Sequence, residues 1–180
     1  FFRGQSYKKK HSKTENKKLK HVLTILFSLF SFPYVWGDAI GTWKVYPSYS
    51  DVSDIVPTGK NVFVLASKSL YSYNVNDGSI RTYSNNDVLN GCNIQNIAWV
   101  NAVKKLVITY SDYTIDLLSL NGDVENISAL ADKQTTDDKT INSIYVDGQY
   151  AYLATGFGIV KVNAKDATIA DSYNLGYKVN

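Results

Sequence analysis

Three stretches of the sequence share one pattern: SLYSYNVNDGSI (69–80), YTIDLLSLNGDV (113–124) and GIVKVNAKDATI (158–169). Each contains apolar residues two positions apart, then a short polar turn, and ends on a β-branched residue. Those final residues, Ile80, Val124 and Ile169, lie 44 and 45 positions apart. Alternation with a period of two indicates β-strands, and the Asn, Asp and Gly of the turns accept the positive φ that tight hairpins need.

The segments upstream of these stretches repeat as well. Continuous apolar runs, typical of strands buried on both faces, occupy residues 61–67, 105–111 and 151–157. Ahead of each run lies a segment with a central isoleucine, namely Ile55, Ile97 or Ile144. Four short strands in a unit of about 40–50 residues are typical of a propeller blade. We therefore predict an all-β fold, a β-propeller, with about three four-stranded blades at residues 52–84, 93–127 and 140–174.

The start of the chain differs from the rest in charge and hydropathy. Residues 1–20 carry eight basic side chains against one acidic residue, Glu15, whereas the whole chain has a net charge of +3. The remainder is therefore net acidic, which argues against a nucleic-acid partner. The apolar run at residues 22–35 has the length of a signal-peptide core and is shorter than the roughly 20 residues of a membrane-spanning helix.

Small residues follow that run at the positions where a signal peptidase would need them, Gly37 and Ala39. We predict that residues 1–39 are a basic extension and secretory signal peptide, with a membrane-retained anchor as the alternative. Residues 40–180 are then the N-terminal part of a propeller exported to the periplasm or the cell surface. Because propellers have about four to eight blades, and because Met is absent, we expect a longer natural chain, whose remaining blades close the ring.

Few residues of the sequence are suited to catalysis. Both histidines, His11 and His21, fall in the leader, and Cys92 is the one cysteine, which we expect to be a small buried residue in a loop. Gly156 and Gly158 are predicted to form a tight turn rather than a phosphate loop. We predict no catalytic, cofactor-binding or metal-binding residues and therefore no enzyme. Paired carboxylates contributed by different blades are the open alternative.

Aromatic residues are abundant, with 14 tyrosines in the chain. Tyrosines in propeller strands ordinarily pack between blades. The alternative is a surface on which they stack against sugar rings or anchor a protein partner. The candidates for such a ligand or partner surface are Trp99, Tyr110 and Tyr145.

Residues 48–100 resemble the N-terminal propeller of the PorZ family, and the resemblance extends over most of residues 43–176. It rests on Trp43 and on three short motifs: YSDV (49–52), LYSY (70–73) and LNGC (89–92). The resemblance implies a non-enzymatic surface component of the Bacteroidetes type IX secretion system. It also implies envelope proteins of a secretion and attachment complex, a sortase among them, and lipopolysaccharide sugar as partners. No binding motif is present from which ligand residues could be transferred.

A second family is similar: the propellers of two-component regulators, which are periplasmic sensors of hybrid histidine kinases. Their repeats combine a Trp-Ile-Gly-Thr strand with a Gly-Leu strand. Here only ATGFGI (154–159) keeps part of that pattern, and LVIT (106–109) stands where the Trp and Gly would be. The sensor function is therefore the alternative to secretion.

Overall fold

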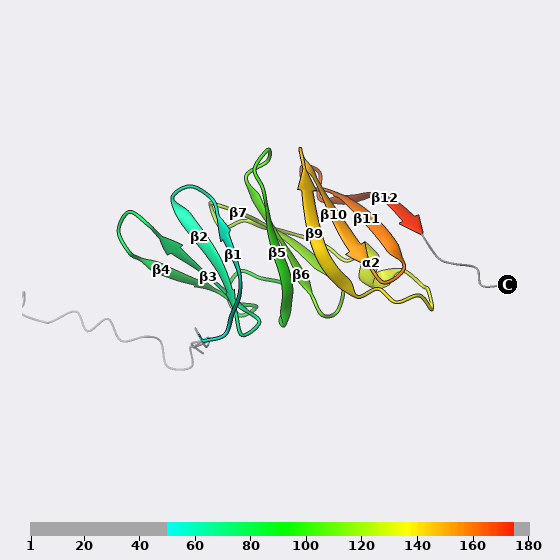
Figure 1. Cartoon of the computed structure of the whole chain (residues 1–180), viewed down its shortest axis with the longest axis horizontal. Helices are drawn as coiled ribbons and strands as arrows, with labels where there is room; N and C mark the ends of the chain where they lie inside the picture. The colour runs from blue at the N-terminus through cyan, green and yellow to red at the C-terminus, as the bar shows by residue number, and fades with distance from the viewer. Residues whose placement is uncertain (1–49, 175–180) are drawn as a thin grey trace, which may run out of the picture. The chain divides into compact units, whose positions relative to one another are not determined.

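The computed structural model describes residues 50–174, which belong to one compact unit of the chain, Trp43–Asn180. These residues form three four-stranded antiparallel sheets, and in each sheet the strands are hydrogen-bonded in sequence order (Figure 1). We refer to the sheets as blades 1, 2 and 3. The predicted leader, residues 1–39, lies outside the described residues. Between residues 50 and 174, no helix has the length and apolarity needed to cross a bilayer.

Each blade is a meander of strands of four to seven residues. Blade 1 consists of β1 (Val52–Pro57), β2 (Asn61–Ala66), β3 (Ser69–Asn74) and β4 (Ile80–Tyr83). Blade 2 consists of β5 (Ile94–Val100), β6 (Lys105–Tyr110), β7 (Ile115–Ser119) and β8 (Val124–Ile127), followed by the one-turn helix α2 (Ala129–Asp132). Blade 3 consists of β9 (Ile141–Asp147), β10 (Tyr150–Thr155), β11 (Gly158–Asn163) and β12 (Thr168–Asn174).

The turn between the third and fourth strands of each blade keeps the repeat in register. Gly78 and Gly122 have φ angles of 72° and 101°, in the left-handed region that glycine adopts readily. The matching residue of blade 3 is Ala167, with a φ of 53°. The predicted alignment of the three turns is thus confirmed, and blade 3 keeps the turn even without glycine.

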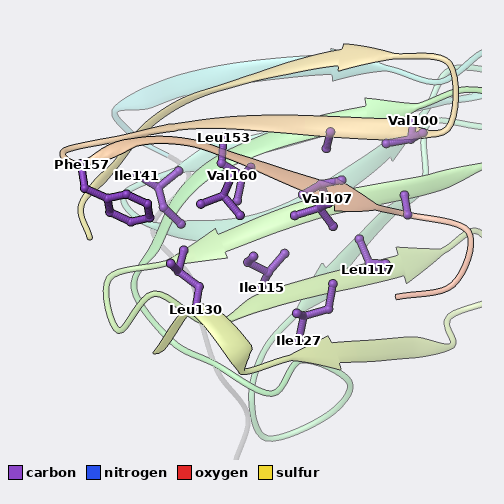
Figure 2. Close-up of a cluster of buried hydrophobic side chains, with 13 residues drawn as sticks. Val100, Val107, Ile115, Leu117, Ile127, Leu130, Ile141, Leu153, Phe157 and Val160 are labelled. Carbon is purple, nitrogen blue, oxygen red and sulfur yellow. The ribbon is translucent and has the colours of Figure 1, made fainter. Parts of the chain in front are cut away.

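The blades pack face to face on two buried clusters. The first seam, between blades 1 and 2, contains side chains from both sheets, among them Phe63, Leu70 and Ile108. The second seam, between blades 2 and 3, is shown in Figure 2, where Val107 and Leu117 of blade 2 lie against Leu153 and Val160 of blade 3. The first strand of blade 2, β5, contacts the first strands of both neighbours, β1 and β9. The fold is therefore all-β, with successive blades of a β-propeller.

The central isoleucines show which face of each blade meets the preceding one. Ile97 is 4% exposed in the first seam, and Ile144 packs against the second. Ile55 holds the same position in blade 1 but is 58% exposed, because no sheet among residues 50–174 covers that face. The lack of a covering sheet also explains why β10 is not buried on both faces, although this was predicted for the run at residues 151–157. Within that run, Tyr152 and Ala154 are only half-buried.

Polar contacts also join blades 2 and 3. The side-chain amide of Asn96 donates to the carbonyl oxygen of Ile141 at 2.9 Å. The ammonium of Lys105 donates to the carbonyl oxygen of Ala164 at 3.1 Å, and it also pairs with Glu125 of its own blade. These contacts fix the position of blade 3 along the sheet of blade 2 more tightly than apolar packing alone, because hydrogen bonds are directional.

Candidate functional site

Trp99, a predicted surface residue, lies in the first seam. It is in β5, and its indole stacks on the ring of Phe63 in β2, with ring centroids 6.4 Å apart and an interplanar angle of 26°. Its side chain is half-buried. Offset stacking of this kind adds to the area that the two rings bury, so Trp99 holds blade 2 on blade 1.

Tyr110, the second candidate, lies in the core. It is the last residue of β6, is 1% exposed, and donates a 2.7 Å hydrogen bond from its phenol to Oδ2 of Asp116. Burial raises the pKa of the Tyr110 phenol well above its usual range, and the hydrogen bond to Asp116 and the charge of that carboxylate raise it further. Tyr110 therefore offers no surface to a partner in this conformation, in contrast to the expectation from sequence.

Tyr145, the third candidate, is 71% exposed on β9. It pairs across the strands with Tyr152, which is opposite Lys161 of β11. The Lys161 ammonium lies 4.1 Å from the ring centroid of Tyr150 and 5.6 Å from that of Tyr152, within range for cation–π attraction. Desolvation lowers the pKa of Lys161, but interactions with Tyr152, and after it with Tyr173 and Tyr150, together outweigh this, so the pKa lies above its ordinary value.

The three aromatic candidates therefore do not form one surface. Trp99 and Tyr110 both lie in the first seam, the first half-buried and the second fully buried, whereas Tyr145 lies on the open face of blade 3, which is turned away from blade 2. A role for Trp99 or Tyr145 in ligand or partner binding stays a prediction.

Asp116 is a buried residue that the sequence analysis missed. It lies in β7 with 0% exposure. Its carboxylate accepts the backbone N–H of Asn90 at 2.8 Å, the side-chain amide of Asn90 at 3.1 Å and that of Asn126 at 2.7 Å, besides the Tyr110 phenol. Four donors replace the water that a buried carboxylate loses. An aspartate inside the apolar run Ile115–Ser119 is the sequence signal that could have revealed it.

This carboxylate anchors the loop between β4 and β5, which forms one wall of a cavity of about 260 Å³ at the first seam. The opposite wall is the β2–β3 turn, Ser67 and Lys68. Cys92 also lines the cavity and is exposed, so the expectation that it is buried is wrong.

Residues suited to acid–base or metal chemistry do not cluster in the part of the chain that the structure describes. No group of three or more His, Cys, Asp or Glu side chains there could hold a metal ion. Gly156 and Phe157 form the two-residue turn between β10 and β11, where Thr155 pairs with Gly158. No helix follows this turn, so it lacks the helix N-terminus that a phosphate loop uses.

Three consecutive four-stranded meanders, each packed face to face on the next, define a protein of the β-propeller class. A family model described as "TSS9, PorZ, N-terminal beta-propeller domain" matches residues 62–180. The chain belongs to this family of PorZ N-terminal propellers. No curated protein matches the chain.

Solved structures agree with this assignment. The chain is 33% identical to PorZ of Porphyromonas gingivalis, described as an essential bacterial surface component of the type-IX secretion system, with a TM-score of 0.65. That match covers 68% of this chain and 17% of PorZ, so the chain spans about a sixth of its relative.

More distant structures share the fold. The extracellular domain of a one-component system, BT4673 of B. thetaiotaomicron, is 14% identical with a TM-score of 0.56, over 73% of this chain and 18% of that one. The extracellular domain of a hybrid two-component system, BT3049 of the same organism, is 21% identical with a TM-score of 0.51, over 69% and 17% of the two chains. At these identities the similarity extends to the propeller fold alone.

Proposed function

We propose that this protein is an exported, non-catalytic binding component of a type IX secretion system at the bacterial cell envelope. The observation that carries the proposal is the match of residues 62–180 to the PorZ N-terminal propeller family. The 33% identity to a surface component of that system supports the same role. Envelope proteins of the secretion complex, and lipopolysaccharide sugar, are the partners that this role entails.

The structure of the described blades is compatible with a scaffold. Its fully buried carboxylate, Asp116, is engaged by four donors and points away from solvent. Each seam contains a cluster of buried apolar side chains. A rigid stack of sheets holds its loops in fixed positions, as a binding surface requires.

Deletion of the gene in the bacterium that encodes it tests the secretion role. We expect loss of type IX cargo from the cell surface, restored by the intact gene and not by a copy lacking the codons for residues 52–174. In-cell crosslinking of the intact protein should capture other envelope proteins of the system. Normal cargo at the surface of the deletion strain would refute the proposal.

The sensor function is the second candidate, because extracellular domains of one- and two-component systems share this fold. It predicts that the deletion strain exports cargo normally but fails to change its transcription in response to an extracellular ligand. The same strain therefore separates the two functions. We rank the sensor function second because this chain is 14% and 21% identical to those extracellular domains, against 33% to the secretion-system component.

A further inference from the structure

The cavity at the first seam has the properties of a small-molecule binding site. The proposed secretion role does not require such a site. It holds about 260 Å³ between the β2–β3 turn of blade 1 and the loop that leads from β4 to β5. Ligand pockets commonly measure roughly 300–1,000 Å³. A cavity slightly below that range suits a molecule of about amino-acid size and is too small for an oligosaccharide.

Both walls of this cavity are held in place by specific contacts. On the loop side, Asn90 is bound by buried Asp116, and Gly91 lies so close to the Tyr110 ring that a Cβ atom would come within 2.7 Å of it. The backbone oxygen of Asn93 accepts the N–H of Ser111 at 3.2 Å. Pre-formed walls lower the ordering cost of binding.

The turn side of the cavity is fixed as well. The N–H of Ser67 donates to the carbonyl oxygen of Asp51 at 3.1 Å, and its hydroxyl donates to that of Ser50 at 2.7 Å. The carbonyl oxygen of Lys68 accepts the N–H of Ile94 at 3.3 Å, which joins the turn directly to the first strand of blade 2. The two walls thus cannot separate without breaking the seam.

The lining combines apolar residues with polar ones, and its charge is positive. Tyr83, Leu89 and Ile94 are each less than a tenth exposed and supply the apolar part. Ser69, Thr82 and Ser84 carry hydroxyl groups that can donate hydrogen bonds. Lys68 is the one charged residue among the described residues that line the cavity, and no carboxylate is among them. The complementary ligand has an apolar body and an anionic oxygen group.

We propose that this cavity binds a small apolar carboxylate, with its carboxylate on Lys68 and the hydroxyl rim and its apolar body against Tyr83, Leu89 and Ile94. A charge-assisted hydrogen bond from lysine orients such a ligand, and apolar contact supplies most of the remaining affinity. An acylated leucine is a ligand of this class and size.

The chain supplies its own reporter of occupancy. Cys92 is the one cysteine in the sequence, lines the cavity and is exposed, so its alkylation reports access to the site. The probe is N-acetyl-L-leucine, and the matched control is N-acetyl-L-leucinamide, which has the same body without the charge. We expect the acid to slow alkylation of Cys92 in the full chain and the amide to have a much weaker effect.

Two lysine variants test the role of the charge. Lys68→Met removes the ammonium but keeps an unbranched side chain at a residue whose φ is 63°. Lys60→Met is the control, because Lys60 is exposed in the turn between β1 and β2, at the other end of β2. We expect Lys68→Met to weaken binding of the acid about tenfold, the usual effect of losing a charge-assisted hydrogen bond, and Lys60→Met to leave it unchanged.

Amide chemical shifts of the same samples provide a readout that does not depend on the thiol. The acid should shift resonances of residues 67–69 and 91–94 and leave those of the Lys60 turn in place. Equal effects of acid and amide, equal effects of the two lysine variants, or no shifts at all with saturating acid would each overturn the proposal. These outcomes are independent of cargo export, so a failure here does not bear on the secretion role.

Discussion

The phenol of Tyr110 donates a 2.7 Å hydrogen bond to the carboxylate of Asp116, and both side chains are almost completely buried in the first seam. Tyr110 ends β6, and Asp116 lies in the neighbouring strand β7. The same carboxylate holds Asn90, 26 residues away, in the loop that enters blade 2. This pair therefore connects the sheet of blade 2 to the loop that crosses the seam.

Replacement of Tyr110 by Phe should lower the free energy of unfolding. The variant keeps the ring but removes one donor from a buried carboxylate, which costs about 1.5–3 kcal/mol. Tyr113→Phe is the control, because Tyr113 is half-buried and its ring interacts with Lys139 through its face, 6.0 Å from the ammonium. We expect the control to change stability by less than about 0.5 kcal/mol. Equal losses in urea denaturation of the two variants would contradict the role assigned to Asp116.

Stability should also fall at alkaline pH because of Tyr110. Its pKa is raised in the folded protein by burial first and by Asp116 second, whereas in the unfolded chain it ionises near its ordinary value of about 10. The folded state thus binds more protons above that pH, so the contribution is fully present below about pH 10 and is lost as pH rises beyond it. Urea unfolding from neutral to alkaline pH measures this. The Tyr110→Phe variant should show a shallower decline, and parallel curves would exclude Tyr110 as the cause.

Gly91 should tolerate no side chain. A Cβ there would lie 2.7 Å from carbons of the buried Tyr110 ring, which cannot move without breaking its bond to Asp116. We expect Gly91→Ala to cost about 1–3 kcal/mol, as overpacking does. Cys92→Ala is the comparison, because Cys92 is the next residue in the same loop and its side chain is exposed, so its loss should change stability by less than about 0.5 kcal/mol. Thermal denaturation should show the larger loss for Gly91→Ala, and the reverse order would contradict a rigid loop wall.

Trp99 and Tyr145 should differ in their effect on stability. Trp99→Ala removes the stack on Phe63 across the first seam, and we expect a loss of about 2 kcal/mol or more. Tyr145→Ser changes a side chain that is 71% exposed, so a change within about 0.5 kcal/mol is expected in this chain. Chemical denaturation of both variants tests this. A large loss for Tyr145→Ser would indicate that the open face of blade 3 is covered in solution.

Ala167→Gly should stabilise blade 3. Ala167 has a φ of 53°, where Gly78 and Gly122 stand in the other blades, and an L-residue pays about 1 kcal/mol or more for that conformation. The entropy that glycine adds to the unfolded chain offsets part of this, so a gain of up to about 1 kcal/mol is expected. Ala164→Gly, in the same turn but fully buried, should instead destabilise. A loss with both variants would show that the Ala167 methyl contributes more by packing than it costs in strain.

The repeat could be predicted from the sequence because it depends on local chemistry. Strand alternation and turn residues recur every 44 or 45 positions, and the three turns align in the structure as they do in the sequence. Whether Trp99, Tyr110 and Tyr145 lie on a surface could not be predicted from such local patterns. Strand periodicity says which residues share a face, but it does not say whether a neighbouring sheet covers that face.

By itself, the sequence determined the all-β class, the four-stranded unit and the left-handed turns, because each follows from interactions among residues close together in the chain. Only the tertiary structure decided that Tyr110 is buried, that Trp99 stacks on Phe63, and that Asp116 binds a loop 26 residues before it. The partners in these contacts come from different strands or blades. Their meeting depends on how one sheet packs on the next, and that packing has no periodic signal in the sequence.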